Sequence, residues 1–234
     1  VGAVDYLMKP FDPDALVAMV VKMYRNFVRI GERRLEVGAV VLAPGFQSFD
    51  PASTEDTCGY RKLPGVLTGL ELERLLSGTG PTGGKLLRPD GRPVEKIAWL
   101  QCVGSRNLPA GADYCSSVCC MFSIKEAVLA KEKSAGAVEA AIFYMDMRTF
   151  GKDYQRYRER AEKEHGIRFE RSRIHSVEPG EDGRLRLLYA DITGSIKDET
   201  FDLVVLATGQ RPPAGTEALA ELTSQGRRVK AVIP

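Results

Sequence analysis

Residues 96–133 have the sequence KIAWLQCVGSRNLPAGADYCSSVCCMFSIKEAVLAKEK. The opening residues of this stretch are mostly apolar and end at a Gly-Ser pair, which is typical of a strand buried in a parallel sheet. A polar loop follows, and a helix with an apolar stripe is expected from Ser116 or Ser117 to Lys133. Strand, loop and helix in this order predict one unit of a parallel α/β sheet.

The remaining pattern extends this α/β architecture into a Rossmann-like parallel sheet. Residues 167–201 alternate in polarity and turn twice, which predicts a small antiparallel meander before the last strand. The predicted strands are 39–42, 97–102, 140–145, 167–174 and 203–207, and the predicted helices are 13–25, 69–77, 117–132 and 153–165.

Four of the five cysteines lie within nineteen residues, as Cys102, Cys115, Cys119 and Cys120, with the spacing C-x12-C-x3-C-C. Four thiolates are the ligands that an iron–sulfur cluster requires. The amino terminus of the expected helix also offers free amide groups and a partial positive charge to an anionic cluster. The sequence therefore favours a metal site, with iron–sulfur ahead of zinc. Cys58 stands apart in a polar stretch and is interpreted as a small buried residue.

Two other interpretations of the cysteines stay open. Structural zinc sites usually have two C-x2–4-C knuckles, and this block has none. Two disulfides are arithmetically available, but neighbours such as Cys119 and Cys120 do not pair easily, and the start of the chain does not resemble a secretory signal. Both interpretations are less favoured than a cluster.

The residues around the cysteines resemble a known family. The runs QCVGSR at 101–106 and YCSSVCCMFSIKEA at 114–127 closely resemble the flavin-containing A subunit of heterodisulfide reductase and its relatives in sulfate reducers. The resemblance covers roughly residues 30–215, and it implies a thioredoxin-reductase-like core that binds FAD and carries a [4Fe-4S] cluster on the four cysteines. Further similar segments are GAVVLAPGF at 38–46, LELERLLS at 70–77, GPTGGK at 80–85, FYMDMRTFGK at 143–152 and VLATG at 205–209.

The pyrophosphate-binding turn of such a flavoprotein is not recognisable in the sequence. One formal G-x-G-x-x-G match occurs at 78–83, but it follows a helix capped by Thr68 and Glu71 instead of a strand, and it leads into no helix. We interpret it as a helix stop and surface loop. The chain is therefore expected to be part of a longer flavoprotein, with an incomplete two-dinucleotide-binding architecture.

Four segments follow from these resemblances. The run VDYLMKPFDPDAL at 4–16 resembles the last strand and helix of a response-regulator receiver domain, so residues 1–26 are interpreted as a receiver remnant in which Lys9 has no working role. The other predicted segments are 27–95, the end of the FAD-binding domain with a connecting helix and loop; 96–213, the Rossmann-like domain with the iron–sulfur loop; and 214–234, a return toward the FAD domain.

The place of the cysteines predicts how electrons move. In two-dinucleotide flavoproteins the Gly-rich turn for NAD(P)H follows the first strand of the second domain, and here the cysteine loop follows that strand. We therefore expect that this domain does not bind NAD(P)H. We also expect that electrons pass to or from the flavin one at a time, through iron. Lys125 is a candidate to stabilise a reduced state near the cluster or flavin, with an exposed helical lysine as an equally weighted interpretation. By the family resemblance, Gly45 and Gly209 are candidate FAD contacts.

Composition sets bounds on the function. The chain has 234 residues and 44% apolar content, which is enough to bury a core. Its formal net charge is +2, which gives no broad basic surface for nucleic acid. Its longest apolar runs are too short to span a bilayer. We expect a cytoplasmic protein.

These observations together predict an oxidoreductase of the heterodisulfide reductase A type, which transfers electrons between a [4Fe-4S] cluster and FAD for the reduction of disulfides or other sulfur compounds. The expected partners are the other redox subunits of such a complex, and a homodimer is a further candidate assembly. The fragment alone is not expected to be catalytically complete. Two alternatives remain: a pyridine-nucleotide-disulfide oxidoreductase with a redox cysteine pair, and a zinc-stabilised module of a receiver-linked regulatory protein.

Overall fold

The structure is a computed structural model that describes residues 41–53 and 58–224. The chain divides into two compact units, Val1–Leu42 and Ala43–Pro234, and all elements below belong to the second. The predicted receiver remnant, the predicted helix 13–25 and half of the predicted strand 39–42 lie outside the described residues.

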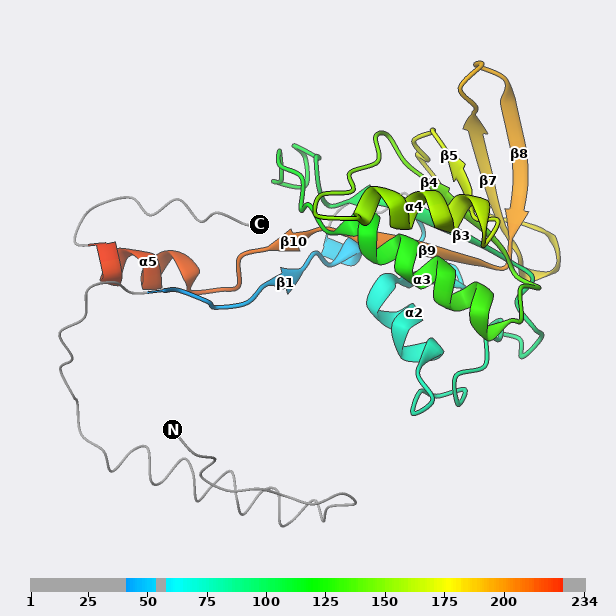
Figure 1. The fold of residues 1–234 in the computed structure, drawn as a ribbon, viewed down its shortest axis with the longest axis horizontal. Coiled ribbons are helices and arrows are strands. Elements are labelled where there is room, and N and C mark those ends of the chain that lie inside the picture. The colour runs from blue at the N-terminus through cyan, green and yellow to red at the C-terminus, as the bar shows by residue number, and fades with distance from the viewer. Residues whose placement is uncertain (1–40, 54–57, 225–234) are drawn as a thin grey trace, which may run out of the picture. The chain divides into compact units, whose positions relative to one another are not determined.

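The second unit contains a five-stranded parallel sheet (Figure 1). The strand order is β2-β9-β3-β4-β5, so β3 has β9 on one side and β4 on the other. The direction of winding reverses at β3, and such a switch point is where open α/β sheets leave a crevice at the carboxyl ends of their strands. The strands are β2 (Val66–Thr68), β3 (Lys96–Val103), β4 (Glu139–Phe143), β5 (Arg168–Glu170) and β9 (Leu203–Thr208).

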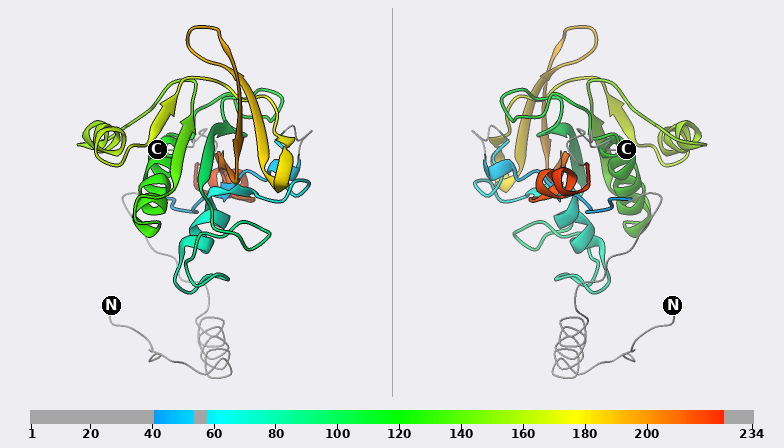
Figure 2. Two further views of the ribbon diagram at one scale, coloured as in Figure 1. Left: turned by 90° about the vertical axis from the view of Figure 1, so that its right-hand side faces the viewer. Right: turned by 90° about the vertical axis from the view of Figure 1, so that its left-hand side faces the viewer.

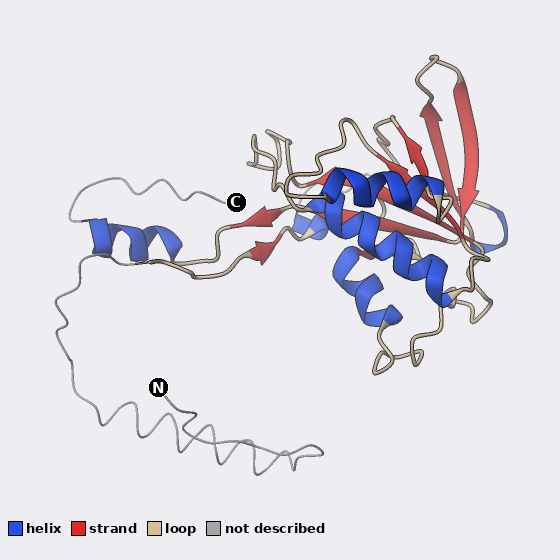
Figure 3. Cartoon of the chain, in the orientation of Figure 1, coloured by secondary structure: helices blue, strands red, loops and turns tan. Residues whose placement is uncertain are grey.

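Three helices pack against one face of this sheet (Figures 2 and 3). The first begins as predicted, because the Thr68 hydroxyl accepts a hydrogen bond from the Glu71 backbone N–H at 3.4 Å and the Glu71 carboxylate accepts one from the Thr68 N–H at 2.7 Å. This capping box satisfies two amide groups at the start of the helix. The helices are α2 (Gly69–Leu76), α3 (Cys119–Lys133) and α4 (Tyr154–Lys163).

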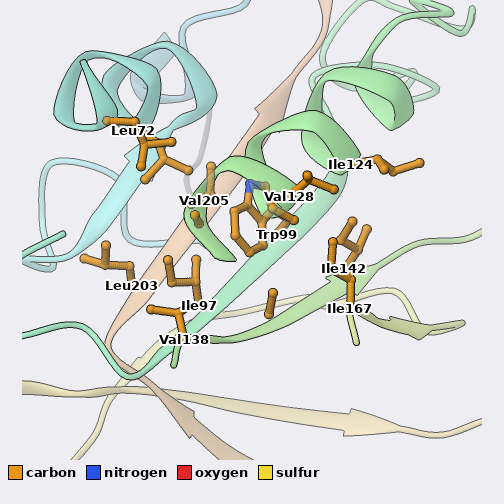
Figure 4. Close-up of a cluster of buried hydrophobic side chains, with 14 of the residues drawn as sticks. Leu72, Ile97, Trp99, Ile124, Val128, Val138, Ile142, Ile167, Leu203 and Val205 are labelled. Atoms are coloured by element: carbon orange, nitrogen blue, oxygen red, sulfur yellow. The ribbon is translucent and has the colours of Figure 1, made fainter. Parts of the chain in front are cut away.

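Two apolar cores cover the two faces of the sheet because side chains alternate along each strand. On the helix face, Ile97 and Trp99 of β3 pack with Val205 of β9 (Figure 4). On the opposite face, the intervening residues Ala98 and Leu100 pack against the meander. The sheet is thus buried on both sides, which explains why its strands are apolar almost without interruption.

The meander is a three-stranded antiparallel sheet in the order β6-β7-β8. It covers the sheet face opposite the helices, where Phe143 of β4 meets the rings of Tyr189 and Phe201 edge-on, at centroid distances of 4.9 and 5.9 Å. The meander strands are β6 (Glu178–Pro179), β7 (Leu185–Ala190) and β8 (Ile196–Phe201). Outside both sheets, β1 (Gln47–Ser48) pairs with β10 (Gln210–Arg211). The remaining elements are the 3-10 turns η1 (Pro51–Ser53) and η2 (Glu181–Gly183) and the helix α5 (Thr216–Ser224).

The predicted α/β fold with a parallel sheet and a small meander is confirmed. The predicted strand 167–174 is shorter in the structure, because β5 ends at Glu170, opposite Phe143, where its partner β4 also ends. The domain boundaries predicted at 95 and 213 both fall inside the second unit. Among the described helices, none combines the length and apolar composition that a membrane crossing needs.

A buried carboxylate fixes the start of β3. The Asp202 side chain is fully buried, and it accepts hydrogen bonds from the backbone N–H groups of Glu95 and Lys96 at 2.7 and 2.8 Å. The guanidinium of Arg88 pairs with it at 3.1 Å, and that of Arg184 lies 3.3 Å away. Because these donors satisfy a buried charge, the loop before β3, the meander and the start of β9 are held together.

A second buried carboxyl group lies on α3. Glu126 is 2% exposed and accepts a hydrogen bond from the Trp99 indole N–H at 2.9 Å. Burial raises the pKa of Glu126 to about 7, and the indole donor opposes that rise only in part. The folded chain therefore binds a proton at Glu126 more tightly than the unfolded chain does.

This carboxyl group predicts a pH-dependent stability. The contribution of protonated Glu126 is complete below pH 4.5 and is lost as the pH rises through about 7. The whole shift corresponds to about 3 kcal/mol of unfolding free energy. We expect Glu126→Gln to remove this part of the pH dependence, so that chemical denaturation at pH 5 and pH 8 gives more similar unfolding free energies in the variant than in the wild type.

The matched control is Glu132→Gln, which neutralises an exposed glutamate on the same helix. We expect it to keep the wild-type difference between the two pH values. An equal pH dependence in Glu126→Gln and the wild type would show that Glu126 does not titrate in this range.

Candidate functional site

The cysteine block lies at the carboxyl ends of β3 and β9, at the switch point of the sheet. Cys102 is the second-last residue of β3, and the register of β3 with β9 shifts between Leu100 and Val103. Its φ is 64°, in the left-handed region that a residue with a side chain rarely adopts. A bulge with this backbone conformation interrupts the alternation of β3 and re-aims the side chain at its end.

Hydrogen bonds close the polar loop that follows Cys102. The Ser116 backbone N–H donates to the Ser105 hydroxyl at 3.1 Å, and the Ser105 hydroxyl donates to the Tyr114 carbonyl at 3.0 Å. The Ser116 hydroxyl lies 3.1 Å from that of Ser105 and accepts from the Gln210 backbone N–H at 2.9 Å. We call Ser105, Ser116 and Gln210 the serine clasp. It brings the segment that carries Cys115 back to the end of β3.

Gly209 makes this closure sterically possible. A Cβ atom on Gly209 would lie 2.9 Å from the Ser105 Cβ, 3.0 Å from the Gly104 carbonyl oxygen and 3.0 Å from the Ser116 hydroxyl. Its backbone N–H donates to Val103 at 2.8 Å. Gly209 therefore allows the end of β9 to touch the serine clasp directly, and the structure gives this residue a packing role that the sequence did not indicate.

The first turn of α3 carries the other two cysteines. Cys119 and Cys120 open the helix and are both buried, and Val118 before them provides no side-chain cap. The Cys119 thiol donates to the Thr208 carbonyl oxygen at 3.6 Å, which ties α3 to the end of β9. No side chain caps the helix, although the Val118 carbonyl accepts from the Met121 N–H at 3.0 Å. The partial positive charge of this terminus therefore favours a negatively charged group beside the cysteines.

The four thiols lie close enough to influence one another's ionisation. Burial, with a smaller contribution from the neighbouring thiols Cys102 and Cys115, raises the pKa of Cys119 to about 12 and that of Cys120 to about 11. Burial also raises the pKa of Cys102. The predicted ligands therefore share one environment, in which the Cys119 and Cys120 thiols are protonated at neutral pH.

Three charged residues beside the thiols were not identified from the sequence. The Arg106 guanidinium lowers the pKa of Cys102 in opposition to burial, and it forms an ion pair with Asp146. The Arg148 side chain lies 3.3 Å from the same carboxylate, and its backbone N–H lowers the pKa of Cys120. Both segments were noted for their family resemblance, which was the one available signal for these roles.

These features fit an iron–sulfur cluster. The donor set is four thiols with no disulfide among them. It is accompanied by a helix terminus that no side chain caps and by the Ser117 backbone N–H, which donates to the Cys115 sulfur at 3.3 Å. Within residues 41–53 and 58–224, no group of three or more His, Cys, Asp or Glu side chains has the geometry to hold one metal ion.

Of the other predicted site residues, Gly209 lies at the serine clasp, and Lys125 pairs with a residue outside the cysteine block. The Lys125 ammonium lies 2.9 Å from the Glu73 carboxylate, and its side chain is 53% exposed, so its role near a cofactor stays a prediction. Gly45 has a φ of 80° with open space around it. Residues 78–83 form turns after α2, as expected for a helix stop and loop. The FAD contacts of Gly45 and Gly209 stay predictions.

Comparison with known proteins gives one consistent group of relatives. The chain is 41% identical over 195 residues to the second iron-sulfur A subunit of CoB--CoM heterodisulfide reductase from Methanopyrus kandleri, a match that covers 82% of this chain and 29% of the relative. It is 40% identical over 199 residues to the A subunit of ferredoxin:CoB-CoM heterodisulfide reductase from Methanosarcina mazei, a match that covers 84% and 25% respectively. The chain thus spans less than a third of the length of these relatives.

Other comparisons add little. No family model matches the chain. A solved sulfide:quinone oxidoreductase from Aquifex aeolicus is 16% identical and covers 50% of this chain and 26% of its own, with a TM-score of 0.29, from which we draw no argument. The sequence similarity to the A subunits of heterodisulfide reductases is confirmed by the curated relatives alone.

The packing of Gly209 predicts a sensitive position. We expect Gly209→Ala to destabilise the chain by about 1–3 kcal/mol, the usual cost of overpacking, because two of the three close contacts involve the clasp serines and the third is backbone. Chemical denaturation measures the unfolding free energy.

Gly78→Ala is the matched control, because a Cβ there meets nothing within 4 Å and neither glycine needs a positive φ. It should leave the unfolding free energy within about 1 kcal/mol of the wild type. Equal effects of the two substitutions would contradict a tight contact at Gly209.

Proposed function

This chain is a homologue of one segment of the heterodisulfide reductase A subunit, and we propose that it carries a [4Fe-4S] cluster that exchanges single electrons with FAD in a larger oxidoreductase. The observation that supports this most directly is the gathering of four thiols, two buried and two half-buried, around the end of β3. When bound, such a cluster supplies one-electron redox chemistry.

The protein's own residues would hold and shield this group. Cys102 and Cys115 would supply thiolates from the two ends of the clasped loop, and Cys119 and Cys120 would supply them from the first turn of α3. Loading must release the protons that the buried thiols carry, because metals bind the thiolate form. The uncapped amides of α3 and the Arg106 guanidinium would then stabilise the negative charge that replaces those protons.

The flavin part of the proposal rests on the family resemblance. Gly45 and Gly209 follow runs that resemble FAD-contacting turns, and Gly209 lies beside the serine clasp, which would place flavin contacts close to the cysteines. The relatives are named as subunits of reductases of the CoB-CoM heterodisulfide. We propose a disulfide or related sulfur compound as the final electron acceptor, reached through other redox subunits of a cytoplasmic complex. A homodimer is a further proposed assembly.

We also propose that the cysteine loop replaces a nicotinamide-nucleotide site. A Rossmann-type domain binds the pyrophosphate where a Gly-rich turn leads directly from its first strand into a helix. Here β3 leads into the clasped cysteine loop, and the helix that follows begins with Cys119 and Cys120. The terminus that would bind pyrophosphate is thus surrounded by thiols.

Metal content tests the cluster. Protein purified without oxygen is expected to contain about four irons and an equal amount of sulfide, with broad absorption near roughly 400 nm. Replacement of Cys102, Cys115, Cys119 or Cys120 by Ser should each lower the bound iron strongly. One zinc without colour would favour the zinc-module alternative, and a metal-free protein with a reversible disulfide would favour the disulfide oxidoreductase.

The matched control is Cys58→Ser, because Cys58 is the one cysteine outside the block. We expect it to retain the wild-type iron content and absorption. Equal loss of iron in this variant and in the four block variants would show that the loss reflects general damage to the fold.

Nucleotide binding tests the replacement proposal. In calorimetry with cluster-loaded protein, we expect no heat of specific binding for NADPH or NADH up to about 1 mM, a concentration that detects even weak sites. A glutathione reductase-type flavoenzyme serves as the positive control for the titration. Binding with a micromolar dissociation constant would refute the proposal.

A further inference from the structure

Arg106, Asp146 and Arg148 form a continuous charged group against the cysteine block. The Arg106 guanidinium lies close enough to the Cys102 sulfur to lower the pKa of that thiol, and it pairs with the Asp146 carboxylate. The second oxygen of that carboxylate accepts from the Arg148 side chain at 3.3 Å. The group therefore runs without a break from a β3 cysteine to the segment that follows β4.

The backbone holds this group in place from both ends. The Arg106 N–H donates to the Tyr114 carbonyl at 2.9 Å, and Arg106 itself has a φ of 53°, so a tight turn fixes its position beside the serine clasp. At the other end, the Arg148 backbone N–H lowers the pKa of Cys120 in opposition to burial. The same group therefore favours the negatively charged form of thiols on two different elements.

The charges have opposite effects on an electron at this site. A cluster held by thiolates becomes more negative on reduction, so a nearby cation or a hydrogen bond to sulfur favours the reduced state and a nearby anion opposes it. Arg106 favours the negatively charged form of the Cys102 thiol, whereas Asp146 disfavours it. Their side chains are 28% and 44% exposed, so solvent screens each charge in part without removing its effect.

We propose that Arg106, Asp146 and Arg148 set the reduction potential of a cluster bound to the four cysteines, with Arg106 raising the potential, Asp146 lowering it and the Arg148 N–H stabilising the reduced state. This inference rests on the proposed function. It assigns to Arg106 the electrostatic role that the sequence suggested for Lys125, whose ammonium is engaged by Glu73.

The experiment is a redox titration of the cluster-loaded full-length protein with dithionite as the one-electron reductant, followed by the electron paramagnetic resonance of the reduced cluster. At the wild-type midpoint, Arg106→Gln should lower the ratio of reduced to oxidised cluster about tenfold, which equals 59 mV for one electron. Asp146→Asn should raise the same ratio severalfold. The opposite signs distinguish an electrostatic effect from general damage, which would not raise the potential.

Arg156→Gln is the matched control, because Arg156 also pairs with an aspartate, Asp153, but its side chain is 82% exposed on α4. It should leave the midpoint unchanged. If both variants keep their iron and their midpoint potentials are unchanged, the inference is overturned while the proposed function stands. A lower midpoint potential in Asp146→Asn would overturn the inference in the same way. If Arg106→Gln loses its iron, Asp146→Asn alone decides. A wild-type protein without iron would overturn the proposed function and the inference together.

Discussion

Cys102 and Cys115 are separated by twelve residues of polar loop, and the conformational entropy of such a loop opposes their approach. The serine clasp opposes that entropy with hydrogen bonds between Ser105, Ser116 and Gln210, and the clasp residues Ser105 and Ser116 are almost fully buried, where a broken hydrogen bond is costly. The clasp can form only because Gly209 has no side chain. The position of Cys115 beside the end of β3 depends on this closure.

The sheet provides the rigid base for that closure. Alternating side chains of β3 and β9 are divided between the helix-face core around Trp99 and the meander-face core around Phe143, so the strands cannot slip by one residue without exposing both cores. At the other end of β3, Asp202 binds two backbone N–H groups and two guanidinium groups. The strand that ends at Cys102 is thus fixed along its whole length.

The sequence predicts the local parts of this arrangement well. The apolar run of β3 and the capping box at Thr68 depend on neighbouring residues, and the cysteine spacing marks the candidate site. The start of α3, predicted at Ser116 or Ser117, lies at Cys119, because no serine side chain caps this helix. The pairing of β2 with β9 and the ion pair of Arg106 with Asp146 join residues far apart in the chain, and no local pattern encodes them. Ser105 and Ser116 resemble ordinary loop residues, since their burial arises only when the loop closes on β9.

The strand order β2-β9-β3-β4-β5 has a consequence for biosynthesis. Although β9 lies inside the sheet, it is the last of these strands to leave the ribosome, and until then β2 and β3 have no shared neighbour. The cysteines emerge about ninety residues before Thr208, Gly209 and Gln210, which complete their surroundings. The nascent chain therefore presents its thiols to the solvent well before the protein can enclose them.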